Sequence, residues 1–207
     1  IPSSVNYIGE GAFRNCESLQ SIKLPEGLTL LNYELFDGCK QLSDIQIPST
    51  VTTIKNSAFN DCKALKTITL PASLSTFENS SWSENSIFSG CSALKSIMVE
   101  AGNKYFESDG TALYNKAKDT LIAFCCCDSL QNIMFEDGVS DLVIEQYAFQ
   151  NCKNINRLVI TSGIKETKYG AFYNAHINKL VITTTHPRSF YEYYLLRDNT
   201  IETIYAP

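Results

Sequence analysis

Three residue types recur every 23 positions along the first third of this chain of 207 residues. They are Pro2, Pro25, Pro48 and Pro71; Phe13, Phe36 and Phe59; and Cys16, Cys39 and Cys62. The phrase Leu-x-x-Ile-x-Leu begins at Leu19 and returns, in part diverged, so that the chain holds eight copies. One copy is too short to bury its own apolar side chains, but copies stacked on one another shield each other. The repeat therefore predicts a solenoid, a chain wound into stacked coils.

Each copy of the phrase predicts a short β-strand, because its last apolar residues alternate with one intervening residue. The proline that follows lacks an N–H group and ends the strand. The residue before each repeated cysteine is of a type that accepts a left-handed backbone and favours a tight turn; these residues are Asn15, Gly38, Asp61, Gly90 and Asn151. The Ala-Phe pair that precedes them predicts a short helical turn with Phe inside. The expected fold is a mainly β, right-handed solenoid of about eight repeats.

The full pattern, I-P-x-x-V-x-x-I-x-x-x-A-F-x-x-C-x-x-L-x-x-I-x-L, is clearest at residues 1–71 and resembles the BspA-like leucine-rich repeats. The resemblance covers essentially the whole chain and implies a single leucine-rich repeat domain, residues 1–207. Proteins of this kind are typically secreted or displayed on the surface of bacteria and some protists, and several are implicated in adhesion to host matrix proteins or other cells. The resemblance thus implies an extracellular or cell-surface location, although the chain itself carries no signal segment.

Three segments depart from the repeat. A polar loop around residues 78–85 carries Trp82, the only tryptophan. Residues 103–127 predict an inserted β-hairpin, with strands near Thr111–Tyr114 and Thr120–Phe124, and this segment also resembles an insertion common in the family. In the C-terminal coil, residues 183–207, the segment Ser189–Leu196 predicts a short helix that caps the stack. The first coil has no strand before it, so its apolar edge predicts either further repeats upstream or self-association between chains.

The eight cysteines fall into two groups. Five occupy the same place in successive coils and are predicted to be buried free thiols, because their parallel Cα–Cβ bonds do not converge as a disulfide requires; these are Cys16, Cys39, Cys62, Cys91 and Cys152. The run Cys125–Cys127 interrupts the repeat and is expected to finish the hairpin. Metal or redox chemistry there is the alternative, but no Cys-x-x-Cys or histidine spacing accompanies the run.

Composition and motifs narrow the classes of function. Because 22 acidic residues outnumber 17 basic ones, a nucleic-acid or anionic-membrane binder is disfavoured. No apolar run is long enough to span a bilayer. The two histidines, His176 and His186, have no adjacent reactive thiol, and no phosphate-binding loop, nucleophile elbow or zinc helix occurs. The sequence predicts a non-enzyme without a cofactor or a metal site.

The outward-facing residue of each strand indicates where a partner would bind. In chain order these residues are Lys23, Gln46, Thr69, Met98, Met134, Val159, Val181 and Tyr205. The last five are apolar and, stacked about 4.8 Å apart, would form an exposed stripe of roughly 20 Å. Arg157 and Lys179 belong to a polar, mostly basic rim beside it. The stripe predicts an adhesive module that binds a host matrix or cell-surface protein. Two alternatives stay open: the hairpin or the tyrosine-rich C-terminal segment covers the stripe, or the chain is a carbohydrate-binding or spacer module of a larger surface protein.

Overall fold

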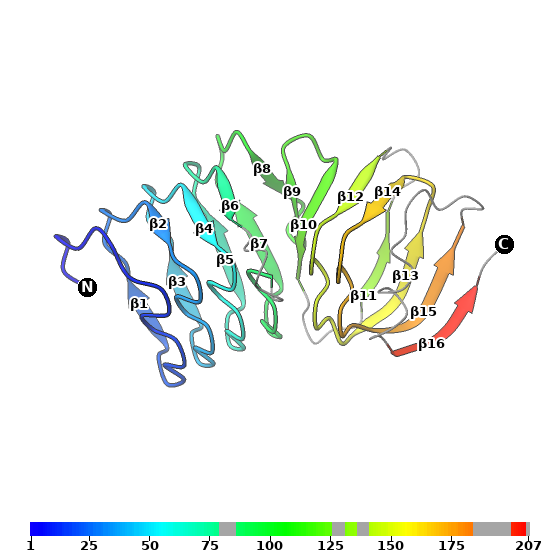
Figure 1. Cartoon of the computed structure of the whole chain (residues 1–207), viewed down its shortest axis with the longest axis horizontal. Coiled ribbons are helices and arrows are strands. Elements are labelled where there is room, and N and C mark those ends of the chain that lie inside the picture. The colour runs from blue at the N-terminus through cyan, green and yellow to red at the C-terminus, as the bar shows by residue number, and fades with distance from the viewer. Residues whose placement is uncertain (79–85, 126–130, 136–140, 184–199, 206–207) are drawn as a thin grey trace.

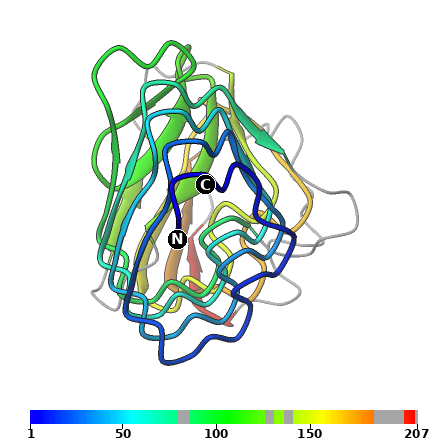
Figure 2. The same cartoon turned by 90° about the vertical axis from the view of Figure 1, so that its left-hand side faces the viewer.

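The chain forms an elongated stack of coils with the N-terminus at one end and the C-terminus at the other (Figure 1). The computed structural model describes residues 1–78, 86–125, 132–135 and 141–183, together with the backbone of residues 131 and 200–205. Viewed from its N-terminal end, the successive coils follow one another around a common interior (Figure 2). The predicted β-solenoid is therefore confirmed.

All eight copies of the repeated phrase contribute strands to one side of the stack. These strands are β1 (Ser21–Lys23), β3 (Asp44–Gln46), β5 (Thr67–Leu70), β7 (Ser96–Val99), β11 (Gln131–Met134), β13 (Ile155–Ile160), β15 (His176–Ile182) and β16 (Thr200–Tyr205). They pair in parallel within three sheets, β1 with β3, β5 with β7, and β11 with β13, β15 and β16, in the expected register; Ile22 of β1, for example, lies opposite Ile45 of β3. The inward side chains at these positions build the core.

A second series of short strands, which the sequence did not predict, closes each coil. It comprises β2 (Leu30–Leu31), β4 (Thr53–Lys55), β6 (Thr76–Glu78), β8 (Phe106–Ser108), β12 (Leu142–Ile144) and β14 (Ile164–Thr167). A complete turn needs a strand from each series, so the solenoid makes about six turns rather than eight. The predicted hairpin is present: β9 (Ala112–Asn115) and β10 (Thr120–Phe124) pair antiparallel, and β10 continues into a parallel sheet with β12 and β14.

The segments that carry the Ala-Phe pairs are stacked turns, and the predicted helical turns are wrong: the described residues contain no helix. The physical reason is the direction of the backbone hydrogen bonds. The N–H groups of Gly11 and Phe13 donate to the carbonyls of Tyr33 and Leu35 in the next coil, at 2.9 and 3.1 Å, and only alternate N–H groups, such as that of Arg14, donate three residues back within the segment. The left-handed residue before each cysteine is confirmed, with φ between 54° and 73° at the five predicted positions, Asn15, Gly38, Asp61, Gly90 and Asn151.

Stacked phenylalanines fill the interior beneath these turns. The rings of Phe13, Phe36, Phe59 and Phe88 follow one another at centroid distances of 5.5, 5.6 and 5.9 Å, with planes within 19° of parallel. The buried side chains form two clusters, one in each half of the stack. The hairpin joins the two clusters, because Leu113 packs in the first and Leu121 in the second.

The cysteine ladder is only partly as predicted. Cys39, Cys62 and Cys91 are buried free thiols, and each donates a hydrogen bond to the carbonyl of a Phe in the preceding coil, at 3.0–3.3 Å. Cys16 is free but exposed, because no described coil precedes it. The prediction is wrong at Cys152, which is disulfide-bonded. The argument from parallel Cα–Cβ bonds excludes a bond within the ladder, but not one to a cysteine outside it.

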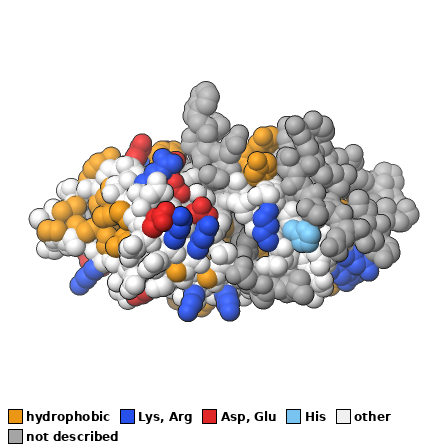
Figure 3. Space-filling view, turned by 90° about the horizontal axis from the view of Figure 1, so that it is seen from below, with side chains coloured by type: hydrophobic (Ala, Val, Ile, Leu, Met, Phe, Trp, Pro, Cys, Tyr) orange, Lys and Arg blue, Asp and Glu red, His pale blue; other side chains and the backbone are white. Residues whose placement is uncertain are grey.

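Several predictions fall outside the described residues. They concern the loop around Trp82, the cap at Ser189–Leu196 and the last two residues of the Cys125–Cys127 run; Cys125 itself is described and is buried. Within the described part of the chain, no helix has the length and apolarity needed to cross a membrane. Hydrophobic side chains are exposed at the N-terminal end of the stack (Figure 3), where Ile1 is 43% and Tyr7 64% exposed.

Candidate binding face of the repeat sheet

The outward face of the first strand series carries two parallel rows of side chains. The alternation within each short strand turns its central residue into the core and its flanking residues to the surface. One row holds the predicted residues, and their pairing is observed: Lys23 lies opposite Gln46, Thr69 opposite Met98, and Val159 between Met134 and Val181. The second row, Ser21, Asp44, Thr67 and Ser96, was not singled out from the sequence, although the same alternation could have revealed it.

The predicted apolar stripe is not continuous, and Val159 is the residue that breaks the prediction. Its side chain is only 4% exposed, whereas Met98 is 51% and Met134 63% exposed. Two features distinguish Val159 from the two methionines: its side chain is shorter, and its strand has a paired strand on each side. Met98 and Met134 lie on the edge strands β7 and β11, while Val159 lies on β13, between two paired strands. Val181 is half-buried on β15.

The remaining predicted residues lie near the second half of this face. Arg157 of β13 is exposed, and Lys179, its partner in register on β15, is half-buried. Tyr205 pairs in register with Val181 through the backbone of β16, and its side chain lies outside the described residues. The structure thus brings Arg157 and Lys179 together and leaves Met98 and Met134 on different sheets.

The hairpin causes the break between these sheets. The N–H group of Ile97 in β7 donates to the carbonyl of Gly110 at 2.9 Å, and the hydroxyl of Ser108 donates to the carbonyl of Ile97 at 2.6 Å. These bonds occupy the edge of β7 that a continuous sheet would offer to β11. The outward face therefore has two parts: a polar part on β1, β3 and β5, ending at β7, and a more apolar part from β11 to β16.

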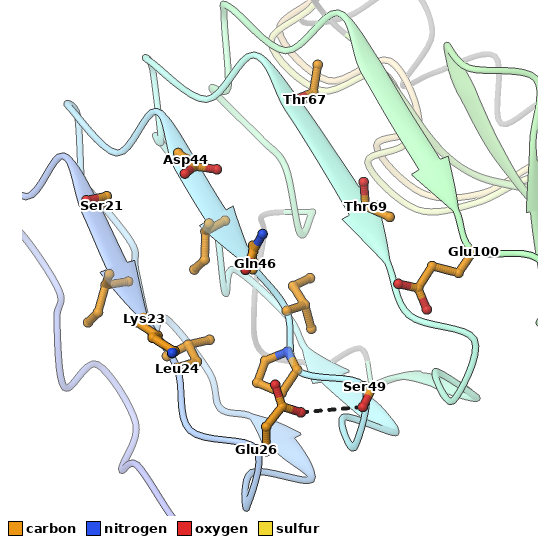
Figure 4. A pocket seen from close by; sticks show the side chains of 14 residues that line it. Ser21, Lys23, Leu24, Glu26, Asp44, Gln46, Ser49, Thr67, Thr69 and Glu100 are labelled. Carbon is orange, nitrogen blue, oxygen red and sulfur yellow. Dashed lines mark hydrogen bonds between the residues drawn. The ribbon is translucent and has the colours of Figure 1, made fainter. Parts of the chain in front are cut away.

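A hollow of about 700 Å³ lies on the polar part (Figure 4). Its outward lining consists of Ser21, Lys23, Asp44, Gln46, Thr67 and Thr69, with Glu26, Ser49 and Glu100 along one rim. The strands are stacked here, with β3 beside both β1 and β5. Backbone turns after the repeated prolines form the rim; Pro48 belongs to the lining.

Side chains on the rim of the hollow have hydrogen-bond partners within the described part of the chain, whereas those on its floor do not. Ser49 donates to the Glu26 carboxylate at 3.4 Å, and the Ala72 N–H group donates to the Glu100 carboxylate at 3.0 Å. For the six floor side chains, no hydrogen bond or ion pair to another described residue is present, which leaves their polar atoms open to solvent or a ligand. They are Ser21, Lys23, Asp44, Gln46, Thr67 and Thr69.

Elsewhere on the N-terminal coils, charged side chains are paired from coil to coil. Arg14 bonds both Glu34 and Asp37, at 2.8 and 3.0 Å, and Lys40 bonds Glu17 at 2.7 Å. On the face of the stack seen in Figure 3, basic and acidic side chains lie close together. The partnerless polar floor of the hollow is therefore a local feature and not a property of the whole surface.

The buried thiols inside the stack are poorly suited to act as catalytic nucleophiles. Burial is the main cause that raises the pKa of the Cys39 thiol to about 11, and burial also raises the pKa values of Cys62 and Cys91. A thiol is a weak nucleophile unless it ionises. Among the described side chains, no three His, Cys, Asp or Glu residues are arranged to hold a metal ion.

Known proteins resemble this chain in sequence pattern and in fold. The family model described as "BspA type Leucine rich repeat region" matches residues 1–110 and 121–207, in six copies. No curated protein is significantly similar to the chain.

Two solved structures share the fold. A leucine rich cell surface protein from Faecalibacterium prausnitzii is 20% identical, with a TM-score of 0.65 over 93% of this chain and 62% of the other. A leucine-rich repeat protein from Bacteroides ovatus is 23% identical, with a TM-score of 0.60 over 92% of this chain and 50% of the other. The chain thus spans less than two thirds of the length of either protein.

Proposed function

Because this chain belongs to the BspA-type leucine-rich repeat family, we propose that it is a non-catalytic surface module that binds a protein partner through its repeat sheet. The observation that carries the proposal is the exposure of two methionines, Met98 at 51% and Met134 at 63%, on the outward face of the strands. Exposed apolar side chains that gather on one face of a protein are a feature of interaction surfaces.

The chemistry of the apolar part suits a protein partner. Methionine adapts its shape to different surfaces and is enriched at protein interfaces, as is arginine. Exposed Arg157 lies on β13, beside the strand that carries Met134. An apolar centre with a polar rim is the usual composition of such interfaces. The partner we propose is a host matrix or cell-surface protein.

An extracellular or cell-surface location fits this function. The structural neighbour from F. prausnitzii is itself named as a cell surface protein. The disulfide at Cys152 points the same way, since disulfides persist mainly in oxidising compartments. The free thiols of Cys39, Cys62 and Cys91 are compatible with that location, because burial protects them from exchange.

The test is binding of the purified chain to a panel of immobilised matrix and cell-surface proteins, measured by biolayer interferometry. We expect at least one partner, and at least a tenfold loss of affinity for it in the double variant Met98→Asp/Met134→Asp. Val159 is left unchanged, because a carboxylate at this buried position would destabilise the fold.

The matched control is Tyr7→Asp/Tyr105→Asp, which places the same charges on side chains that are 64% and 52% exposed away from the sheet. It should bind the partner as the unchanged chain does. If no protein of the panel binds, or if the methionine variant binds equally well, the proposed interface is wrong. Self-association through the exposed N-terminal end stays a separate prediction, and sedimentation of the Tyr7 variant tests it.

A further inference from the structure

The polar hollow on β1, β3 and β5 differs in composition from the methionine surface, by which we mean the outward face around Met98 of β7 and Met134 of β11. Its six floor side chains form a grid of two rows and three strands (Figure 4): Ser21, Asp44 and Thr67 in one row, and Lys23, Gln46 and Thr69 in the other. Paired strands, such as β1 and β3, are about 4.8 Å apart, and outward side chains along one strand are about 6.7 Å apart. With β5 beside β3, the grid presents closely spaced hydrogen-bonding groups.

The floor of the hollow offers donors and acceptors together and no net charge. Lys23 is a donor and Asp44 an acceptor, and their charges cancel. Gln46 and the hydroxyls of Thr67 and Thr69 both donate and accept. None of these groups has a partner among the described residues, so a ligand meets them without first breaking a contact within the chain. A ligand with many hydroxyl groups satisfies such a mixed set better than one that only donates or only accepts.

We propose that this hollow binds a short neutral oligosaccharide, a function separate from protein binding at the methionine surface. The rim carboxylates of Glu26 and Glu100 disfavour phosphorylated, sulfated or otherwise anionic ligands. The carboxylates of Asp44, Glu26 and Glu100 outnumber the Lys23 ammonium, so a basic peptide is the competing ligand and is included in the test below. An apolar ligand would leave the floor groups desolvated and unpaired.

The dimensions agree with this class of ligand. The hollow's volume, about 700 Å³, is in the range of small-molecule sites, roughly 300–1,000 Å³. Its floor is small and polar, so a flat, hydroxylated molecule can reach the strands directly. Because the hollow is open and its outward floor is polar, we expect weak binding, with a Kd of about 0.1–1 mM.

The experiment follows backbone amide signals of the ¹⁵N-labelled chain by NMR during titration with four neutral trisaccharides: maltotriose, cellotriose, mannotriose and chitotriose. At least one should shift the amides of residues 21–23, 44–46 and 67–69. Asp44→Ala/Gln46→Ala should weaken that binding at least tenfold. The control Glu10→Ala/Gln41→Ala removes the same two chemical groups from exposed positions outside the hollow and should leave affinity unchanged.

Other outcomes overturn the proposal. It is wrong if none of the four trisaccharides binds, or if the shifts map away from β1, β3 and β5. It is also wrong if a hexalysine peptide binds the hollow and the sugars do not, which would make it a site for basic protein segments. Met98→Asp/Met134→Asp should bind the sugar normally, so a failure of the methionine interface and a failure of the sugar site give different results.

Discussion

Replacing Phe59 by alanine should be among the most damaging single changes in this solenoid. The Phe59 ring is fully buried and lies between the rings of Phe36 and Phe88, at 5.6 and 5.9 Å. Phe13, in the first coil, is only half-buried and has a single stacked neighbour, Phe36, at 5.5 Å. The two positions carry the same residue in the same turn, so they differ mainly in how completely the ring is enclosed.

The magnitudes follow from that enclosure. Phe→Ala in a core costs about 3–5 kcal/mol of unfolding free energy. At Phe59 the coils on both sides are held by backbone hydrogen bonds and cannot collapse into the cavity, so we expect about 4–5 kcal/mol. The Phe13 ring is only half-buried in the unchanged chain, so its removal exposes about half as much apolar surface to account for, and we expect a cost of about 2 kcal/mol. Phe59→Leu keeps the apolar character and most of the volume, and should cost about 1.5 kcal/mol.

The assay is urea denaturation followed by far-ultraviolet circular dichroism, with hydrogen exchange to localise the loss. Because each coil contacts only its neighbours, Phe59→Ala should also weaken the coupling between the first two coils and the rest, and so lower the m-value. Equal costs at Phe59 and Phe13, or a Phe59→Leu variant as unstable as Phe59→Ala, would refute the claim that stacked rings hold the coils together.

Two further predictions concern the turns and the thiols. Gly38→Ala should cost about 1–2 kcal/mol, because φ is +72° and the added Cβ would collide with the Asn15 side chain; Gly9→Ala, where no atom lies near, should cost less than about 0.5 kcal/mol in the same denaturation assay. The pKa of the Cys39 thiol is about 11 in the folded chain, against an ordinary 9.0, because the folded chain favours the neutral thiol. The resulting contribution to the free energy of unfolding is intact below pH 9 and is lost as the pH rises from 9 toward 11. Unfolding free energy should therefore fall over that interval, and less steeply in Cys39→Ala; no difference between the two pH profiles would contradict this.

The alternation of apolar residues in the repeated phrase predicted the first series of strands. The second series was not predicted, and the structure shows why. In the second series, apolar residues are three apart, as at Val51 and Ile54 or Leu74 and Phe77, and this spacing does not indicate a strand. These strands are only two to four residues long and exist because the adjacent coil supplies hydrogen-bond partners, such as Ile54 opposite Phe77. Pairing between coils is a property of the stack, which no single copy of the repeat displays.

The candidate site shows a similar limit. Alternation correctly placed Met98 and Met134 on the outward face, because it depends only on the local strand. It could not separate Val159 from them, because burial at that position depends on which strands flank β13. Nor could it predict that Gly110 of the hairpin would take the edge of β7 and divide the face in two. Contacts between segments far apart in sequence decide both of the outcomes that alternation missed.

The division between inward and outward positions also explains why similarity to known structures identifies the fold of this chain and not its ligand. Inward residues such as Ile22, Ile45 and Phe36 determine the coil and its stacking, so a chain can keep the fold at 20% identity, as the F. prausnitzii protein shows. Outward residues such as Asp44 and Met134 make little contribution to packing and can change without altering the coil. In the function proposed above, recognition depends on those outward residues, because function is carried by sites and not by folds. Ligand specificity in this family must therefore be read from the outward rows of each chain, one protein at a time.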